Sequence, residues 1–457
     1  MTDQGELMLD RTLAFIKKFI PKSLFRVLQP AYHFTLGYIS ALWYGRPSEK
    51  MIVVGVTGTT GKTTVIYLLA AILRAAGLKA GYISTAMFSD GEKEWLNDKK
   101  MTLPGRFFTQ HLLGRMKKNG CGVAVVETTS QSVVQFRHRF INYDVLLFTG
   151  LYPEHVEAHG GFENYKKAKG ELFSHLKNCR KKNINGKDIA KTIIVNADDK
   201  HAGYFLDFWA DKKITFSTKG KNADMAGSNI KSGAGGISFL LNNMEVKMKV
   251  LGGFNAKNAL AAGAVGKSLT VPLEKIKEGL EKITSIPGRL EKINSGKNFI
   301  IIVDYAYEPN AVAKLYETAK AIPHGKIIHV LGSAGGGRDK ARQPKLGKLA
   351  GDNADYVIVT NEDPYDEDPM QIINEVFSGI TPHPPTPSPG GRGWGEGVNI
   401  FRILDRREAI KKALTLAREK DIVLVTGKGS EQAICVANGK KIPWDDRKVI
   451  REVLREI

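Results

Sequence analysis

Residues 55–64 read GVTGTTGKTT and lie between an apolar, β-branched run at Met51–Val56 and a helical pattern that ends at Gly77. Backbone N–H groups of a glycine-rich turn and of a helix N-terminus together form a cradle for phosphates. The spacing is G-x-x-G-x-x-G-K-T, a variant of the usual phosphate-loop string, which would place a glycine at Val56. The strand–loop–helix context therefore predicts a nucleoside triphosphate site rather than a glycine turn without a ligand.

Within this loop, Lys62 is expected to reach the β- and γ-phosphates and the Thr63 hydroxyl to bind Mg²⁺. The loop residues expected around the nucleotide also include Gly58, Thr59, Thr60, Gly61 and Thr64. Kinases, GTPases and ligases share such a loop, so it leaves the reaction open. An N-K-x-D guanine signature is missing from the later strands, which argues against a GTPase.

The chain around the loop alternates short apolar runs with helical patterns, which is typical of an α/β fold with a mostly parallel sheet. The first series of buried strands is predicted at Met51–Val56, Val123–Glu127, Val145–Thr149 and Ile193–Asn196. A second, Rossmann-like series is predicted to contain strands Phe299–Asp304, Ile327–Leu331, Tyr356–Thr360 and Ile422–Thr426, with helices at about Ala311–Ile322 and Arg407–Glu419.

These patterns divide the 457 residues into three parts. A basic, amphipathic helical segment is expected at 1–50, the phosphate-loop domain at 51–285 and the second α/β domain at 286–457. Residues 381–397, TPHPPTPSPGGRGWGEG, are too rich in proline and glycine for a regular element and are expected to form a flexible insertion. A proline-rich docking motif is the alternative for this insertion.

Composition sets broad limits on function. Hydrophobic residues make up 42% and charged residues 25% of the chain, as in globular proteins, and the net charge is +20. Such a charge attracts anions, but no aromatic-interleaved or helix-turn-helix pattern indicates nucleic-acid binding.

Cys121, Cys179 and Cys435 form no C-x-x-C, and the acidic start resembles no secretory signal. A cytoplasmic location is therefore expected.

Residues 11–45 mix apolar and aromatic residues with lysines and arginines. They are expected to form two short helices broken at Pro21 and Pro30. Their apolar run is too short to span a bilayer. Two interpretations stay open: a basic anchor that lies in a membrane interface, and helices packed on the body of the protein.

Acidic and histidine residues follow two of the predicted strands. Glu127 ends a buried strand, and the carboxyl ends of parallel strands are where open sheets bind ligands, so this carboxylate is expected near Mg²⁺. The next strand brings Glu154, His155 and His159 to the same edge, in a string that differs from the H-E-x-x-H zinc motif. From pattern alone, Lys169 is a solvated lysine on a helix.

With these pieces in order, the chain resembles the Mur ligase family, in particular its UDP-N-acetylmuramoyl-tripeptide synthetases, from about Ile52 to Arg447. The motifs that carry the resemblance are GVTGTTGKTT, ETTSQSVVQFR, TGLYPEHVEAHGGFENYKKAKGELF, NADD, GGFNAKNALAA, PGRLE, DYAYEPNAV, GSAGGGRDKARQP, TNEDPYDEDP and GKGSEQ. The resemblance implies a ligase that uses ATP and Mg²⁺ to join an acceptor carboxylate, such as UDP-N-acetylmuramoyl-L-alanyl-D-glutamate, to an amino acid through an acyl-phosphate.

The resemblance also implies roles for single residues. Lys62, Glu127, His155 and Lys169 match catalytic residues, and Thr63, Glu127, His155 and a carbamylated Lys169 match the metal ligands. The positions implied to contact the nucleotide are Asn258, Arg289, Asp304, Arg338 and Asp339. Those implied to hold the acceptor or the amino acid are Thr102, Thr129, Arg137, Glu362, Asp363, Gly427 and Glu431.

Three departures from the family pattern bear on the substrates. Only residues 1–50 stand where the family has a larger uridine-diphosphate domain. The sequence therefore leaves open how the nucleotide-sugar part of the acceptor is bound, and whether the acceptor is a UDP-sugar. The diaminopimelate-selecting Asp-Asn-Pro-Arg is here Glu362-Asp363-Pro364-Tyr365, which removes a bidentate arginine. The family's G-K-G-H-E and D-Y-A-H are here GKGSE (427–431) and DYAY (304–307). The added amino acid therefore stays open.

Other functions remain as alternatives. A folylpolyglutamate synthase-like enzyme or another amide ligase would share the phosphate loop. A membrane-tethered nucleotide-binding module without catalysis belongs to a different class, and the presence of Lys62, Glu127, His155 and Lys169 together argues against it. The sequence leaves the oligomeric state open.

Overall fold

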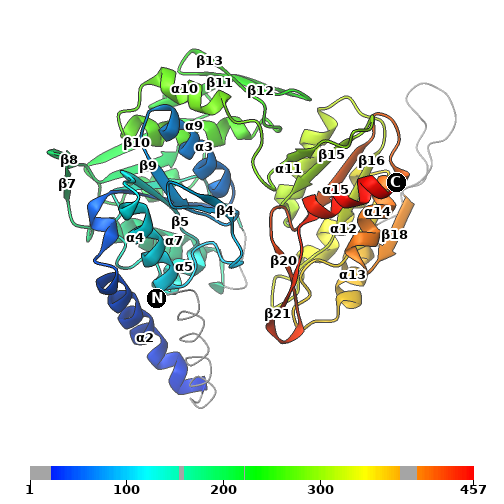
Figure 1. The fold of residues 1–457 in the computed structure, drawn as a ribbon, viewed down its shortest axis with the longest axis horizontal. Helices are drawn as coiled ribbons and strands as arrows, with labels where there is room; N and C mark the ends of the chain where they lie inside the picture. The colour runs from blue at the N-terminus through cyan, green and yellow to red at the C-terminus, as the bar shows by residue number, and fades with distance from the viewer. Residues whose placement is uncertain (1–21, 154–158, 221, 381–398) are drawn as a thin grey trace. The chain divides into compact units, whose positions relative to one another are not determined.

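The computed structural model describes residues 22–153, 159–220, 222–380 and 399–457 (Figure 1). The chain forms two compact units. The first contains the residues up to Ser228 together with Leu241–Met244 and Lys257–Lys282. The second contains Asn229–Leu240, Glu245–Ala256 and Ile283–Ile457.

The larger sheet has the strand order β13-β12-β11-β10-β9-β6-β1-β5-β2-β3-β4. From β11 to β2 each neighbouring pair is parallel, and β3 and β4 continue the sheet as antiparallel strands. Its strands are β1 (Ile52–Thr57), β2 (Ala80–Ile83), β3 (Met87–Ser89), β4 (Glu94–Leu96), β5 (Val123–Glu127), β6 (Val145–Phe148), β9 (Thr192–Asn196), β10 (Lys212–Ser217), β11 (Met225–Gly233), β12 (Gly236–Leu241) and β13 (Met244–Met248). A separate hairpin joins β7 (Lys182–Ile184) to β8 (Lys187–Ile189).

Helices cover this sheet and bury apolar side chains against it. One core joins the inward side chains of β1, β5, β6 and β9 to those of α4, α7 and α8. On α3, Ile72 approaches α10 closely, since a Cβ on Gly279 would lie 2.5 Å from the Ile72 Cα. The helices are α2 (Lys22–Trp43), η1 (Pro47–Lys50), α3 (Lys62–Ala75), α4 (Arg106–Lys118), α5 (Ser130–Val134), α7 (Phe162–Leu176), α8 (Ala202–Leu206), α9 (Asn255–Ser268) and α10 (Leu273–Glu281).

The second unit contains a six-stranded sheet in the order β14-β15-β19-β16-β17-β18, parallel except for β14. Its strands are β14 (Glu291–Ile293), β15 (Ile300–Asp304), β16 (Ile327–Leu331), β17 (Tyr356–Thr360), β18 (Asn399–Ile403) and β19 (Ile422–Thr426), and a hairpin adds β20 (Ala433–Val436) and β21 (Lys440–Pro443). Its helices are α11 (Pro309–Lys320), α12 (Arg342–Asn353), α13 (Pro369–Ser378), α14 (Arg406–Leu416), η2 (Ala437–Gly439) and α15 (Asp446–Glu456).

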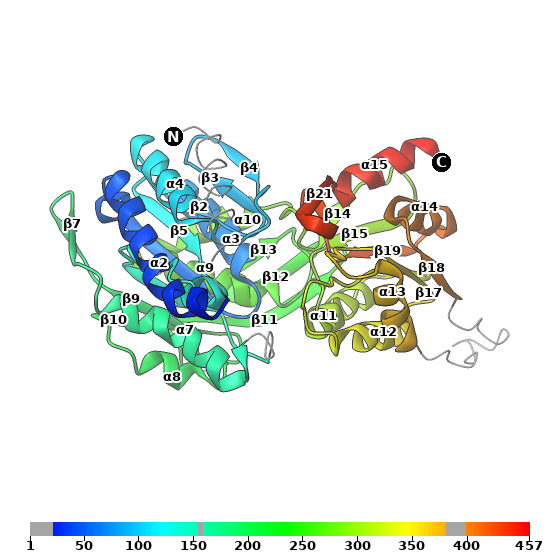
Figure 2. The ribbon, with the colours of Figure 1, turned by 90° about the horizontal axis from the view of Figure 1, so that it is seen from below.

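Two cores lie on the two faces of this sheet. One packs α11, α12 and α13 against the strands, and the other packs α14 and α15. Figure 2 shows the two groups of helices on opposite sides of the strands. The predicted α/β fold with a mostly parallel sheet is confirmed in both units, and strands rich in β-branched residues such as IIHVL in β16 are buried along their whole length.

A single helix, α2, runs through Pro30, so the prediction of a break at this residue is wrong. Proline removes one helical hydrogen bond and crowds the preceding turn. Beyond it, Ser40 and Ala41 are buried, and a Cβ on Gly37 would lie 3.0 Å from the Phe140 ring. Packing of this face on the body stabilises the helix past the proline. Pro21 and the insertion at 381–397 lie outside the described residues.

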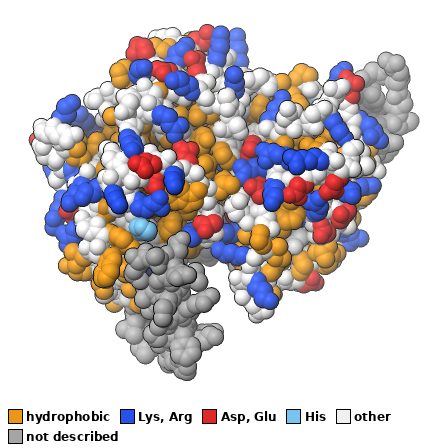
Figure 3. Space-filling model, in the orientation of Figure 1, with side chains coloured by type: hydrophobic (Ala, Val, Ile, Leu, Met, Phe, Trp, Pro, Cys, Tyr) orange, Lys and Arg blue, Asp and Glu red, His pale blue; other side chains and the backbone are white. Residues whose placement is uncertain are grey.

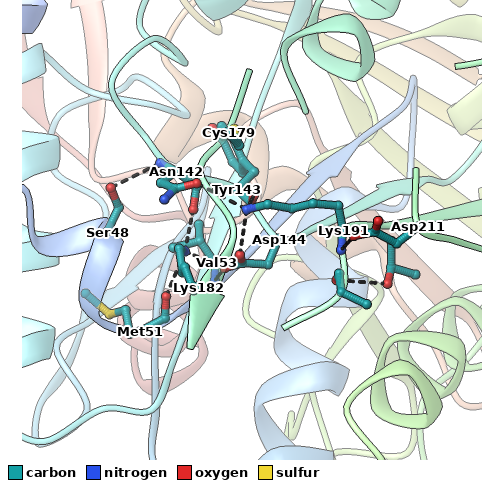
Figure 4. A network of polar contacts seen from close by, with 12 residues as sticks. Ser48, Met51, Val53, Asn142, Tyr143, Asp144, Cys179, Lys182, Lys191 and Asp211 are labelled. Atoms are coloured by element: carbon teal, nitrogen blue, oxygen red, sulfur yellow. Dashed lines mark hydrogen bonds and ion pairs between the residues drawn. The ribbon is translucent and has the colours of Figure 1, made fainter. Parts of the chain in front are cut away.

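Two buried lysines share one carboxylate at the amino end of β6 (Figure 4). Asp144 is fully buried, pairs with Lys182 and accepts a 2.8 Å hydrogen bond from Nζ of Lys191. It also accepts one from the backbone N–H of Val53 at 2.8 Å. Burial lowers the pKa of Lys182 to about 8, although Asp144 opposes this. This carboxylate therefore ties β1, β6 and the β7 hairpin together.

Within the described part of the chain, none of the helices combines the length and the apolar character that crossing a bilayer requires.

Candidate functional site

The phosphate loop is closed tightly by its surroundings. Gly58 and Gly61 adopt positive φ angles of 144° and 82°. A Cβ on Gly58 would lie 2.0 Å from the Thr149 hydroxyl, and one on Gly61 would lie 2.4 Å from Oδ1 of Asn258. The Thr149 hydroxyl, at the end of β6, donates to the Thr60 carbonyl at 2.7 Å. Only glycine fits at these two positions, and predicted Asn258 does lie beside the loop.

The Lys62 ammonium folds back over the loop. Its Nζ donates to the carbonyl oxygens of Gly58 at 3.1 Å and Thr59 at 2.8 Å. Among the described residues, no carboxylate pairs with it. Lys62 is also the first residue of α3, whose opening N–H groups lack intrahelical acceptors. The loop thus offers a cation and backbone donors, which suit a phosphate chain.

Glu127, at the end of β5, is buried among hydroxyl groups. It accepts hydrogen bonds from Thr63 at 2.9 Å and from the Thr85 hydroxyl and backbone N–H at 2.9 and 2.8 Å. A threonine hydroxyl and a carboxylate oxygen are hard ligands of the kind that Mg²⁺ takes in nucleotide sites. Thr85 was missed in the sequence, although it follows β2 at the same sheet edge.

Lys169 is 2% exposed, so the pattern-based prediction of a solvated lysine is wrong. On α7 it lies next to Tyr165, Ala168 and Leu172, which form the buried face of the helix. Its Nζ donates to the Gly58 carbonyl at 2.9 Å and lies 4.6 Å from the centre of the Tyr165 ring. The helix therefore delivers this ammonium to the phosphate loop.

Predicted His155 lies outside the described residues, as does Glu154. His159 is described, and its Nε2 is 3.1 Å from the Ser130 hydroxyl. Across the described ranges there is no group of three histidine, cysteine, aspartate or glutamate side chains placed to hold a metal ion. The hydroxyl–carboxylate pair of Thr63 and Glu127 is thus the part of the predicted metal site that the structure brings together.

Of the three positions implied for the acceptor, Thr102 is connected to this pair through Thr85. The Thr102 hydroxyl is 2.8 Å from that of Thr85, which in turn binds Glu127. Thr129 caps α5 in a reciprocal capping box with Ser132. Arg137 donates to the carbonyl next to Thr102, and burial lowers its pKa. Within the part of the chain that the structure describes, its Nε has no partner.

In the second unit, predicted residues gather where β15 ends. Asp304 accepts hydrogen bonds from the backbone N–H groups of Leu290 at 2.6 Å and Ala306 at 2.7 Å, and burial raises its pKa. The Arg289 guanidinium lies 4.4 Å from the centre of the Tyr305 ring. Asp304 therefore positions the Arg289–Leu290 segment at the sheet edge.

The loops after β17 and β19 bring the remaining predicted residues together. Glu362 is 4% exposed, burial and the adjacent Asp363 raise its pKa, and its Oε2 lacks a partner among described residues. Gly427 leaves space for it, since a Cβ there would lie 2.3 Å from that oxygen. Lys428, missed in the sequence, donates to Asp363 at 2.8 Å and to Glu431 at 2.7 Å. Only the fold shows that this lysine links two separate loops.

Arg338 and Asp339 lie just before α12. Asp339 accepts a 3.0 Å hydrogen bond from the backbone N–H of Ala341, and the Arg338 guanidinium lies close to the side chain of Tyr365. Tyr365 has a positive φ of 53°. The residue that replaces the family's arginine is thus held against a cation.

Comparisons with known proteins agree with this geometry. Residues 56–266 match the Mur ligase middle domain, and residues 288–429 match the Mur ligase glutamate ligase domain. A UDP-N-acetylmuramyl-tripeptide synthetase of Roseiflexus sp. is 35% identical over 446 residues, covering 96% of this chain and 85% of that protein. A UDP-N-acetylmuramoyl-L-alanyl-D-glutamate--2,6-diaminopimelate ligase of Halalkalibacterium halodurans is 32% identical, covering 92% and 82%.

Among solved structures, a folylpolyglutamate synthase of Mycobacterium tuberculosis superposes with a TM-score of 0.65 at 17% identity, covering 87% of this chain and 92% of that one. An identity this low shows a shared fold alone.

Proposed function

Because this chain belongs to the Mur ligase family of ATP-dependent amide-bond ligases, we propose that it joins the carboxylate of a cell-wall precursor to the amino group of an amino acid. The observation that carries the proposal is the arrangement at the first sheet edge. There Lys62 covers the phosphate loop, and the Thr63 hydroxyl lies 2.9 Å from the Glu127 carboxylate.

The proposed acceptor is UDP-N-acetylmuramoyl-L-alanyl-D-glutamate, which the name of the Halalkalibacterium relative contains. Thr102, Thr129 and Arg137 are proposed to hold its peptide end. Two contacts support this assignment. The Thr102 hydroxyl connects through Thr85 to Glu127, and Arg137 donates to the carbonyl of the residue after Thr102. Among the residues that the structure describes, the Nε of Arg137 has no hydrogen-bond partner, so this guanidinium keeps a donor for an acceptor carboxylate.

ATP is proposed to bind with its phosphates on the loop and its adenine side toward Asn258, which lies beside Gly61. Thr63 and Glu127 would hold Mg²⁺, with His155 and Lys169 as further proposed ligands. Mg²⁺, when bound, would neutralise charge on the phosphate oxygens. The oxygen-rich donor set of Thr63 and Glu127 fits this ion.

The proposed chemistry has two steps. An acceptor carboxylate oxygen attacks the γ-phosphorus of ATP, the bond to the β-phosphate oxygen breaks, and ADP leaves. The amino group then attacks the acyl carbon, phosphate leaves with the electrons of its bond to that carbon, and the nitrogen loses a proton. The Lys62 ammonium and the N–H groups of the loop stabilise the negative charge that moves from the γ- to the β-phosphate.

Lys169 is proposed to react with carbon dioxide. Its neutral amine would form a C–N bond to the carbon and release a proton, which leaves a carbamate anion in place of the ammonium. The burial of Lys169 beside the Gly58 carbonyl supports a role in the phosphate site. Bicarbonate labelled with ¹³C should give a carbamate carbon signal in the NMR spectrum of the wild type. An equal signal from Lys169→Arg would refute the assignment.

The added amino acid is proposed to carry no second carboxylate at its far end. Tyr365 stands where the family's diaminopimelate motif has arginine, and a phenol cannot make a bidentate pair with a carboxylate. The buried Glu362 carboxyl near Gly427 adds acidic character to this region. Both features disfavour diaminopimelate relative to lysine.

The variant Tyr365→Arg is expected to raise kcat/KM for diaminopimelate relative to lysine by about tenfold or more, because it restores a charged, bidentate donor. Steady-state phosphate release with each amino acid measures the ratio. Tyr365→Phe is the matched control, since it keeps the Cβ at the same positive φ and adds no charge. An unchanged ratio in Tyr365→Arg would remove Tyr365 from the specificity site.

Phosphate release by the purified chain tests the proposed function. Mg·ATP, UDP-N-acetylmuramoyl-L-alanyl-D-glutamate and single amino acids are supplied, and release should require all three. A reduced pteroate with glutamate tests the folylpolyglutamate synthase alternative, and binding of ATP without any turnover would favour the non-catalytic module. Absence of Mg·ATP binding by calorimetry would sink the ligase assignment.

A peripheral membrane contact through residues 11–45 is also proposed. Residues 11–21 lie outside the described part of the chain. α2 packs one face on the body, as its buried Ser40 and Ala41 show, and leaves large apolar side chains on the other. Such a helix can lie in the plane of a membrane interface.

A further inference from the structure

The outer side of α2 carries a continuous apolar stripe. Its members spread over about half of the helix circumference and are each at least 41% exposed: Phe34, Tyr38, Ile39, Leu42 and Trp43. Trp43 reaches 65%. On the face where α2 lies, Figure 3 shows hydrophobic side chains next to lysine and arginine side chains. Exposed apolar residues gathered in this way mark an interaction surface.

Beside this α2 stripe lies a pocket of about 320 Å³. Its apolar wall is formed by Phe34, Tyr38 and Phe140, whose rings pack edge to face at 5.0 and 5.6 Å. Because Phe34 and Tyr38 belong to both features, the pocket and the stripe form one surface. Three arginines, Arg46, Arg139 and Arg180, also line this pocket, which we call the arginine pocket.

The arginine pocket carries an excess of positive charge. Glu49 is the one acidic residue among the described residues that line it, against three arginines. Its carboxylate lies 3.8 Å from the guanidinium groups of both Arg46 and Arg180. These separations are longer than hydrogen bonds, so Glu49 offsets charge without using the guanidinium donors. Those donors suit the oxygens of a phosphate.

The pocket is remote from the chemistry. Ile141 and Asn142, which line it, precede β6, so it lies at the amino edge of the parallel strands. The phosphate loop follows the carboxyl end of β1, at the opposite edge. A ligand in this pocket is therefore distinct from the nucleotide.

We propose that the arginine pocket binds the phosphate headgroup of an anionic phospholipid in a bilayer, with the α2 stripe lying between the headgroups and the acyl chains. This inference rests on the proposed membrane contact and assigns it a headgroup site, and it is independent of the ligase chemistry. A soluble phosphate would account for the arginines alone. The aromatic wall and Trp43 require an apolar partner as well, and tryptophan and tyrosine favour the membrane interface.

Vesicle sedimentation with the full-length chain tests this site. The probes are vesicles of phosphatidylcholine alone and of phosphatidylcholine with phosphatidylglycerol. The wild type should bind the anionic vesicles, and Arg139→Glu/Arg180→Glu should weaken partitioning by about tenfold or more. Trp43→Ser should weaken it as well. The matched control is Lys212→Glu/Lys213→Glu, which reverses two exposed charges on β10 and should retain most of the binding.

Each outcome decides the proposal. If Arg139→Glu/Arg180→Glu and Lys212→Glu/Lys213→Glu lose vesicle binding equally, the attraction is due to net charge alone and the proposed site is wrong. Full competition by inorganic phosphate, or equal binding to neutral vesicles, would also overturn it. Phosphate release without vesicles should be unchanged in the arginine variant. Lost vesicle binding with intact turnover supports the site, whereas lost turnover in the wild type refutes only the proposed ligase function.

Discussion

Replacing Lys62 by alanine is expected to lower acceptor-dependent ADP release by about 10²–10³-fold or more. The ammonium lies over the carbonyl oxygens of Gly58 and Thr59, at the mouth of the phosphate loop. In that place it can neutralise charge that develops on the departing phosphate, and alanine supplies neither charge nor donor. Coupled detection of ADP with saturating Mg·ATP, acceptor and amino acid measures the loss.

The fold should survive this change, because the hydrogen bonds of the Lys62 side chain among the described residues go to loop carbonyls alone and the side chain is itself partly exposed. Circular dichroism and the melting temperature check this. Lys50→Ala, at an exposed lysine just before β1, is the matched control and should keep wild-type turnover. Full turnover in Lys62→Ala would show that the loop does not act on the transferred phosphate.

The second large effect is on stability. Asp144→Ala is expected to destabilise the protein by about 3–5 kcal/mol, because it removes the carboxylate shared by two buried lysines. Lys182 and Lys191 would be left as unpaired charges, and the backbone N–H of Val53 would lose its acceptor. This is a large share of the net stability of a typical domain. Urea unfolding followed by circular dichroism measures the difference.

The penalty should depend on pH. The folded pKa of Lys182 is already depressed to about 8, below its ordinary value of 10.5. Between these values the unfolded chain binds more protons than the folded one, so this group makes stability rise with pH. Without Asp144 the depression deepens, so the variant's deficit should shrink as pH rises toward about 8, where Lys182 also loses its proton in the folded wild type. Asp98→Ala, at an exposed ion pair with Lys99, should change little. A pH-independent deficit would contradict this account.

Local signals in the sequence were enough to predict the phosphate loop and the strands β1, β5, β6, β9, β15, β16, β17 and β19. The string from Gly58 to Thr64 is contiguous, and its meaning depends on the strand before it and the helix after it, both of which follow from apolar periodicity. The central strands of both sheets, such as β5, β6, β9, β16 and β19, are buried along their whole length, so they read as mostly apolar runs. The family motifs then assigned roles to residues whose surroundings the pattern alone did not describe.

What the sequence determined by itself is the phosphate loop and the central buried strands of the two sheets, because both arise from neighbours along the chain. The tertiary structure alone decided that Lys169 is buried against Gly58, 111 residues away, that Thr85 binds Glu127, and that Lys428 joins Asp363 to Glu431. The tertiary structure also showed that α2 continues as one helix through Pro30. Burial and long-range hydrogen bonds depend on which faces meet in the fold, and local sequence patterns do not show which faces meet.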